Sequence, residues 1–538
     1  MKLMRIINIS FLIIMVVFST ACDDSVLIEE PQGFLSPENS FNSVEGFEAA
    51  ISELHRRSRS LRTNESSMWP NIEGDKAITT LYANGTDLAW FVVPAQNFFT
   101  DYSRINSTNV ISRNIWRMLY KIINNSNTII TRLEDAPLSE PNKNLIRGKA
   151  RFFRAFAYRY LVYLYGGVPV LTEEIVSPKL DFTRGSITEV LELMRADLEY
   201  ASEHLPTENP GDGKLSKAAA DHVLTETLIS LGDYDGAIAA ASRVIDDSQY
   251  ELMTQRFGAY TSMDGDVFWD LFRLGNQNRT SGNLESIWVW QMEFGVPGGE
   301  ANHEFTRAWR PFTERLRDSE GNRAILDSDD IGRGVGFVKP TNYLDSVIWL
   351  SDFDNDMRNS SFNMQREYVN NNPASPEFGQ VIVPRPGDLD RLHFVYVQKA
   401  ACPEGYPQGY DRNGRMYTDI YAIRLAETYL LRAEAHLMKG DAASAAADIN
   451  VVRSRANASP VQVGEVDIDY LLDERARELV AEEPRRLTLA RTGKLVERVR
   501  LYNPISAPNI QDFHRYWPIP QEEIDANLEV SLEQNAGY

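Results

Sequence analysis

Cysteine is almost absent from this 538-residue chain, in which Cys22 and Cys402 are the only two. So few thiols build no disulfide framework, and the surroundings of Cys402 favour a small buried or half-buried filler over a catalytic nucleophile. Positive charge is also scarce, because 55 Lys and Arg stand against 76 Asp and Glu. The resulting net charge of −21 argues against nucleic-acid binding, since a phosphate backbone attracts the opposite sign.

The sequence signatures of common enzyme classes are missing as well. The chain has no HExxH, GxSxG, P-loop or CxxC motif, and its seven histidines are scattered without ligand spacing. The glycines of GRGVGF, residues 332–337, lack the strand–turn–helix context of a dinucleotide site, so a loop with unusual backbone angles is the better interpretation. Carboxylates are abundant, but a sequence cannot show a pair at the spacing of about 5 to 9 Å that glycosidases need. We therefore predict no enzymatic activity and no cofactor.

Two acidic segments resemble the start of a calcium-binding loop. Neither reaches a glutamate at the twelfth position, where Asn363 and Val338 stand instead. Helix capping and turn formation by aspartate explain these residues more simply, so we predict no metal site and keep calcium as the alternative. The acidic positions are Asp352, Asp354 and Asp356 in DFDNDMR, and Asp327, Asp329 and Asp330 in DSDDIG.

The first 21 residues read as an export signal. Lys2 and Arg5 precede an apolar run that ends at Phe18, which is too short for a permanent membrane helix. The small residues that follow lead to Cys22 and resemble a lipoprotein box, in which the thiol is acylated and the chain is cut just before it. The alternative is an ordinary signal cut after Ala21 that leaves a free thiol. Cleavage at this point removes two basic residues and takes the net charge to −23.

Helical periodicity dominates the chain beyond an acidic tether over 22–38. Apolar residues recur at helical spacing over Ser40–Arg62 and Asn114–Leu133, and again up to Tyr165, where Gly166-Gly167 stops the helix. No Gly/Ser or Pro-rich linker divides the chain, so we predict one large domain over 39–538 rather than several.

Two helical pairs share one pattern. LSKAAADHVLTETLISLGDYDGAIAAASRVID and YAIRLAETYLLRAEAHLMKGDAASAAADINVVRSRA each contain an apolar helix, a Gly-Asp turn and an alanine-rich helix. Small residues let antiparallel helices approach closely, as in tetratricopeptide units of about 34 residues. The pairs lie roughly two hundred residues apart, so other helices of the domain must cover their apolar faces. We predict a mainly α fold, with a helical scaffold over about 40–256 and 419–500.

The segment between the pairs, about 257–418, has a different composition. Gly, Pro, Asn and Asp accumulate and periodicity fades, which predicts a loop-rich insertion with few short strands. SIWVWQMEF is one candidate strand. Ordered loops of this length usually carry function, so the insertion is where we expect much of the ligand-binding face.

Four stretches of the chain belong together as a pattern. They are LVYLYGGVPVL, the pair that ends in MKGDAASAAADINVVRSRA, the helix LLDERARELVAEEPRRLTLARTGKL, and the closing YWPIPQEEIDANLEVSLEQNAGY. Together they resemble the SusD/RagB family of outer-membrane lipoproteins, in content and in order along the chain. The closing stretch is the most specific, and in it Ala536 stands where the family more often has proline. Segments GFVKPTNYL and DFDNDMRNSSFN also look like family segments.

The resemblance implies a SusD-like, non-catalytic, cell-surface protein, lipid-anchored at Cys22 in the outer membrane of a Gram-negative cell. It implies that the protein binds an oligosaccharide or glycan and delivers it to a SusC-like TonB-dependent transporter. Asp23-Asp24 is consistent with the acidic signal that such lipoproteins use to reach the surface. The alternatives are the peptide-binding lid of a peptide importer and, less favoured, a secreted glycoside hydrolase.

Aromatic side chains in loops are the residues that a sugar binder needs. The apolar face of a pyranose packs on a flat ring, and its hydroxyls need polar partners. Tryptophans in periodic or strand-like segments are expected in the core instead, namely Trp116, Trp288, Trp290 and Trp349, and Trp517 of the closing motif is expected to be structural. The candidate ligand-binding residues are Trp69, Asn84, Asp87, Trp90, Phe91, Trp309, Arg310, Tyr406 and Tyr410.

Overall fold

The structure is a computed structural model, and it describes most of the chain beyond residue 40. The described residues are 41–63, 81–93, 99–211, 213–296, 298–299, 302–326, 332–400 and 415–538. The predicted signal, the lipidation site Cys22 and the tether lie outside them, and so do Trp69, Tyr406, Tyr410 and the acidic residues 327–330. Among the described helices none is long and apolar enough to cross a membrane.

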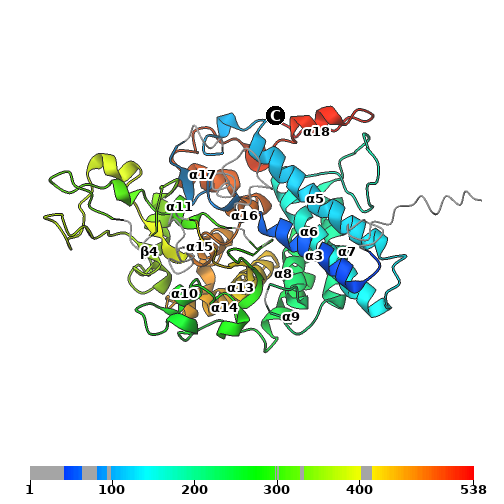
Figure 1. The fold of residues 1–538 in the computed structure, drawn as a ribbon, viewed down its shortest axis with the longest axis horizontal. Helices are drawn as coiled ribbons and strands as arrows, with labels where there is room; N and C mark the ends of the chain where they lie inside the picture. The colour runs from blue at the N-terminus through cyan, green and yellow to red at the C-terminus, as the bar shows by residue number, and fades with distance from the viewer. Residues whose placement is uncertain are drawn as a thin grey trace, which may run out of the picture.

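The first half of the chain forms the predicted helical scaffold (Figure 1). Successive helices from α5 to α9 pack against one another in chain order, and α3 lies on α5 and α6. The buried face of α3 carries Phe47, Ile51 and Leu54, as the periodicity predicted. The helices are α3 (Val44–Arg59), α5 (Val110–Arg132), α6 (Glu140–Tyr165), α7 (Ile187–His204), α8 (Lys217–Leu231) and α9 (Tyr234–Ile245).

Glycine and aspartate set the ends of these helices. Gly166 ends α6 with a φ of 75°, and Gly232 ends α8 in the left-handed region. The carboxylate of Asp233 then accepts a hydrogen bond from the backbone N–H of Gly236 and starts α9. The Gly-Asp turn predicted from the sequence is therefore confirmed.

The second helical pair consists of α13 (Leu425–Met438) and α14 (Ala442–Arg455). It repeats the same turn, with Gly440 at a φ of 89° and Asp441 as the N-cap of α14. Helix α13 packs directly on α9, so the two pairs that are far apart in sequence lie side by side (Figure 1). Helix α13 of the second pair thus covers apolar surface of the first pair.

The segment predicted as one helix from LLDERAR to RTGKL is two helices, α15 (Ile468–Leu479) and α16 (Arg485–Arg491). Ala481, with a φ of 63°, and Pro484 interrupt it. The chain continues through α17 (Leu495–Tyr502) and ends after α18 (Gln521–Ala526). The break turns α16 away from α15 and places Arg485 and Arg486 inside the protein, where both are buried.

The described strands are short and pair two by two in antiparallel fashion. Strand β1 (Ala89–Phe91) pairs with β3 (Val338–Pro340), so that Trp90 lies opposite Lys339. The candidate strand SIWVWQMEF is confirmed as β2 (Ser286–Trp290), which pairs with β6 (Ile420–Arg424). Strands β4 (Met364–Gln365) and β5 (Tyr396–Val397) form the third pair.

The described residues hold three hydrophobic clusters, of which two contain the tryptophans expected in the core. The larger of the two lies among the scaffold helices and contains Trp116, Trp288, Trp290 and Trp517. The smaller lies mainly within the insertion, joined by residues of 83–91 and 476–481, and contains Trp349, so all five of these tryptophans are buried as predicted. The insertion holds mostly loops, short 3-10 turns and the short helices α10 (Val267–Asp270), α11 (Phe305–Trp309) and α12 (Asn342–Asp345).

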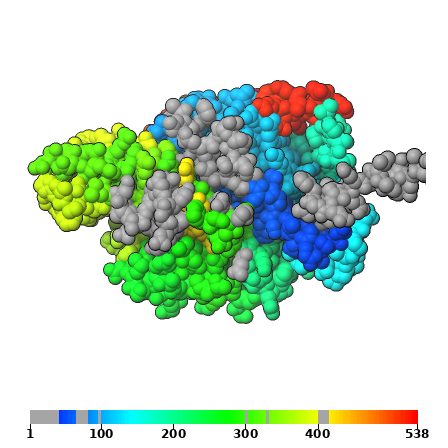
Figure 2. All heavy atoms as spheres, in the orientation of Figure 1, coloured from blue at the N-terminus to red at the C-terminus, as the bar shows by residue number. Residues whose placement is uncertain are grey.

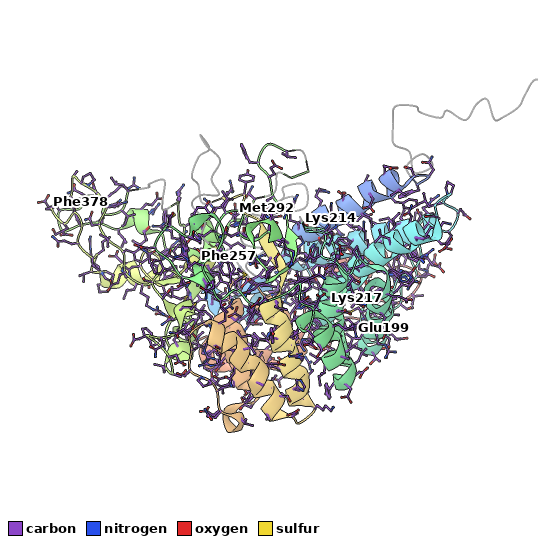
Figure 3. The ribbon with its side chains drawn as sticks, turned by 90° about the horizontal axis from the view of Figure 1, so that it is seen from below. Glu199, Lys214, Lys217, Phe257, Met292 and Phe378 are labelled. Atoms are coloured by element: carbon purple, nitrogen blue, oxygen red, sulfur yellow. The ribbon has the colours of Figure 1, made fainter. Side chains whose placement is uncertain are left out.

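The first part of the insertion packs on the scaffold through β2, and the later part extends away from the scaffold helices as a lobe. Figure 2 shows this lobe as the yellow-green to yellow mass at one end of the molecule. Figure 3 places Phe378 at the far tip of this lobe and Glu199 and Lys217 on the scaffold side. The β1–β3 pair joins an N-terminal segment to this lobe, so residues near Trp90 meet residues of the insertion.

Candidate ligand-binding site

Most of the candidate residues around β1 are buried in the fold. Asp87 has no exposed surface and forms ion pairs with Arg485 at 2.7 Å and Arg498 at 2.8 Å. Burial alone would raise the pKa of Asp87, but the two guanidinium groups outweigh it and lower that pKa below the usual value. Asn84 accepts a hydrogen bond from the hydroxyl of Thr100 at 2.6 Å and is also buried.

The remaining described candidates of the insertion are buried too. Trp309 is 1% exposed and Arg310 is 4% exposed. The guanidinium of Arg310 lies 5.8 Å from the ring centre of Tyr396. Phe91 stacks on Phe337 with ring centres 5.2 Å apart and has no exposed surface. Asn84, Asp87, Phe91, Trp309 and Arg310 therefore serve packing and pairing in this fold, and we leave them out of the proposed binding surface.

Trp90 is the described candidate that keeps partial exposure. It faces away from the buried neighbours Ala89 and Phe91, because side chains alternate along a strand. The ammonium group of Lys339 lies 5.5 Å from the centre of its indole ring and donates a hydrogen bond to the carbonyl of Leu389 at 2.6 Å. Burial lowers the pKa of Lys339, and the nearby carboxylate of Asp390 partly offsets this.

The GRGVGF segment is laid against α11 and the residues that follow it. Gly336 donates its N–H to the carbonyl of Arg310 at 2.8 Å, and Val335 donates to Arg307 at 2.9 Å. A Cβ at Gly334 would lie 2.6 Å from the Arg310 carbonyl oxygen, so only glycine fits there. Gly336 has a φ of 60°, which confirms the prediction of a loop with unusual backbone angles.

This close packing gathers cations around one aromatic ring. The guanidinium carbons of Arg315, Arg391 and Arg333 lie 4.6, 5.4 and 5.6 Å from the ring centre of Phe312. Arg391 also lies 5.4 Å from the ring of Phe337. Cations within about 6 Å of a ring centre are attracted by its π face. We call Arg307, Arg315, Arg333, Arg391 and Lys339, together with Phe312, Phe337 and Trp90, the basic–aromatic patch.

Like charges within the patch repel one another. Burial lowers the pKa of Arg391, and the neighbouring Arg315 and Arg307 lower it further. Among the described residues, Arg391 is held by its hydrogen bond to the carbonyl of Val335 at 2.7 Å rather than by a carboxylate. Arg333 does have an acidic partner, Glu314, at 3.0 Å. Among the described residues of the patch, positive charge therefore exceeds negative charge.

A second group of arginines lies deep in the fold, around α15. Arg358 contacts Glu474 at 2.7 Å and Glu478 at 3.1 Å, and Arg424 contacts Glu478 at 2.7 Å. Arg453, Arg455 and Glu285 complete what we call the buried ion-pair network. Burial would raise the pKa of Glu474, but Arg358, Arg477 and Arg453 outweigh it and lower that pKa to about 2.

The acidic segment DFDNDMR contributes two carboxylates to this network. Asp356 caps a 3-10 turn and chelates Arg358, with 2.6 Å between Asp356 Oδ2 and Arg358 Nη2. Asp352 pairs with Arg453 at 2.6 Å and accepts a hydrogen bond from Ser459. Capping and pairing thus account for Asp352 and Asp356, while the second acidic segment, 327–330, lies outside the described residues.

The sequence reasoning missed the arginines of the patch. Arg315, Arg333 and Arg391 are spread over 77 positions, and none stands in an aromatic-rich motif. The signal that was available is composition: in an acidic chain, residues 307–339 contain seven Arg or Lys residues within the loop-rich insertion. Their convergence on Phe312 required the backbone pairing of 332–337 with 307–312.

The fold is mainly α, with a helical scaffold and a looped lobe that presents aromatic and basic side chains. The sequence model described as the SusD family matches residues 392–538. A second model, described as starch-binding associating with outer membrane, matches residues 64–225. The chain belongs to the SusD/RagB family, whose members are binding proteins.

Individual relatives agree with this assignment. The chain is 26% identical to a SusD-like protein of Formosa agariphila over 100% of this chain and 99% of the relative. It is 38% identical to the starch-binding protein SusD of Bacteroides thetaiotaomicron over 22% of each chain.

Solved structures show the same fold. Surface glycan-binding protein A of Bacteroides thetaiotaomicron, solved in complex with laminarihexaose, superposes with a TM-score of 0.69 at 19% identity and covers 91% of this chain and 99% of its own.

Proposed function

We propose that this protein binds an oligosaccharide or glycan at the cell surface without catalysis and delivers it to a SusC-like TonB-dependent transporter in the outer membrane. Membership of the SusD/RagB family carries the proposal. It is supported by a relative named for starch binding and by a fold neighbour in complex with laminarihexaose. Cys22 is the proposed lipid anchor, and Asp23-Asp24 the proposed surface-export signal.

Trp90 supplies the stacking platform in this proposal. Its ring is partly exposed on β1 and lies beside the ammonium group of Lys339 on the paired strand β3. The C–H face of a pyranose packs on such a ring, while Lys339 beside it offers a donor to a sugar oxygen. Of the other proposed contacts, Trp69, Tyr406 and Tyr410 lie outside the described residues, and they remain candidates by their sequence context.

Binding calorimetry tests the proposal directly. The mature protein is titrated with a panel of purified glycans, and reducing ends are measured in parallel. We expect binding without release of new reducing ends. Because a central tryptophan often dominates an interface, Trp90→Ala is expected to weaken binding by about tenfold or more.

Phe378→Ala is the matched control. Phe378 is 58% exposed at the tip of the lobe, so this substitution removes an exposed aromatic ring away from Trp90. It is expected to bind like the unaltered protein. Binding of peptides with no binding of any glycan would replace the proposal by the peptide-importer alternative. Release of reducing ends would show that the protein is an enzyme.

A further inference from the structure

The basic–aromatic patch lies on a protein whose net charge is −21. Such a chain has carboxylates to spare, and it uses them where arginines are buried, as Glu285, Glu474 and Glu478 show. In the patch, by contrast, Arg315 and Arg391 lie on aromatic rings, Arg391 donates to a backbone carbonyl, and Arg333 shares Glu314 with Arg323. An excess of positive charge that the described residues do not neutralise is a surface prepared for an anion.

The geometry of the patch suits anionic groups spaced along a chain. Three guanidinium groups surround the single ring of Phe312, and Arg391 extends the cluster to Phe337. The carbonyl of Leu389 accepts a hydrogen bond from Lys339, and the ammonium group of Lys339 also lies over the ring of Trp90. A planar guanidinium donates two parallel hydrogen bonds to a carboxylate or a sulfate, which a neutral hydroxyl cannot match in strength.

Local acids do not cancel the charge among the described residues. Glu314 pairs with Arg333, and it also contacts Arg323 at 3.3 Å. Asp390 lies near Lys339 and is exposed. Arg315 is exposed on the ring of Phe312, and the structure gives it no carboxylate contact among the described residues. Arg315 is thus the most accessible cation of the cluster.

We propose that the ligand of this protein is an anionic glycan, one that carries carboxylate or sulfate groups, and that Arg315, Arg333 and Arg391 bind those groups while Trp90 stacks on a sugar ring. This inference rests on the proposed glycan-binding function and adds the charge of the ligand. Carboxylate and sulfate are distinguished by experiment, because both fit a guanidinium donor pair.

Matched pairs of polysaccharides test the inference. Polygalacturonate is compared with its methyl-esterified form for carboxylate, and a sulfated galactan with the same galactan after desulfation for sulfate. Affinity electrophoresis of the mature protein is expected to show retardation by at least one charged member and tenfold weaker retardation by its neutral counterpart. Retardation should also weaken as salt rises, because exposed charges are screened.

A double variant locates the effect. Arg315→Gln with Arg333→Gln removes two patch cations, and Arg195→Gln with Arg500→Gln removes two partly exposed arginines from α7 and α17 as the matched control. Each lost charged hydrogen bond is expected to weaken binding of the anionic glycan by about tenfold. The control variant should bind like the unaltered protein.

Four outcomes would overturn the inference, the last of them together with the proposed function. One is equal affinity for charged and neutral members of both pairs, and another is an equal loss in the patch and control variants. In the third, only neutral glycans bind and depend on Trp90, in which case the proposed function stands and the inference fails. Retardation by polyglutamate with none by any glycan would defeat both, because the ligand would then be an acidic peptide.

Discussion

Two clusters of arginines in this protein are built in opposite ways. In the buried ion-pair network, Arg358, Arg424 and Arg453 each contact at least two carboxylates and have almost no exposed surface. In the basic–aromatic patch, Arg315 and Arg391 lie on the ring of Phe312, and Arg315 is exposed. The same side chain thus serves internal cohesion in one place and offers its charge to solvent in the other.

The difference follows from the cost of removing a charge from water. A guanidinium that is buried loses several kcal/mol of solvation, and in the network carboxylates compensate for this loss. At the surface, water and an aromatic face stabilise the cation, and a carboxylate is not required. An unmatched cation at the surface is therefore affordable to the fold and available to a ligand.

Glu478→Gln should have the largest effect, because it breaks the interior side of this comparison. Glu478 contacts Arg358, Arg424 and Arg455, and these arginines hold its pKa far below the ordinary range although burial opposes them. The substitution leaves buried positive charge without compensation. We expect the free energy of unfolding to fall by about 3 to 5 kcal/mol in guanidinium titrations at pH 7.

Glu53→Gln on α3 is the control for that measurement. Glu53 pairs with Arg56 at 2.6 Å, but both side chains are partly exposed. Surface pairs of this kind contribute about 1 kcal/mol or less. If Glu478→Gln were no more destabilising than Glu53→Gln, the network would not be the cohesive element described here.

The buried side chain of His303 is expected to give a smaller effect on the free energy of unfolding, and one that depends on pH. Burial, together with repulsion from Arg62, lowers the pKa of His303 to about 3. In the unfolded chain the imidazole titrates near 6.5, so the unfolded state binds the extra proton as pH falls below that value. The part of the free energy of unfolding that is linked to His303 is therefore fully present above about pH 6.5, and it is lost progressively as the pH falls to about 3.

The comparison is made between the unaltered protein and His303→Gln. At pH 4.5 the free energy of unfolding of the unaltered protein is expected to be about 3 kcal/mol lower than at pH 7 because His303 stays neutral in the fold. The loss is roughly 1.4 kcal/mol for each pH unit below 6.5. The variant should lose correspondingly less between pH 6.5 and 4.5 in denaturant titrations. The window stops there because carboxylates such as Glu474, with a pKa of about 2, begin to reduce stability at lower pH. Parallel curves for the two proteins would contradict the prediction.

Much of the fold could be predicted from local pattern. Periodicity and the Gly-Asp turns located α6, α8, α9, α13 and α14, because helix signals act over a few residues. The break between α15 and α16 was missed although Pro484 was visible in the sequence. There the strong apolar pattern on both sides concealed a change of direction that depends on tertiary contacts.

The site could be predicted less well, because burial is decided by long-range pairing. Asp87 lies in a polar, loop-like segment, yet its partner Arg485 is 398 positions away along the chain. Trp309 follows a loop motif, yet the backbone of 332–337 is laid against its helix and the side chain is 1% exposed. No local pattern contains either fact, so an aromatic or acidic residue in a loop predicts a ligand contact only weakly.

Arg315→Gln should have the smallest effect on stability, and it tests the surface side of the comparison. Arg315 is exposed and repels Arg391, whose pKa is lowered by burial and by this neighbour. Its removal costs one cation–π contact but relieves a like-charge repulsion, so the free energy of unfolding should change by less than about 0.5 kcal/mol. Because salt screens the repulsion, the variant should gain most relative to the unaltered protein at low ionic strength. A loss comparable to that of Glu478→Gln, measured in the same guanidinium titration, would mean that the fold depends on this cation and that the patch is not held in reserve for a ligand.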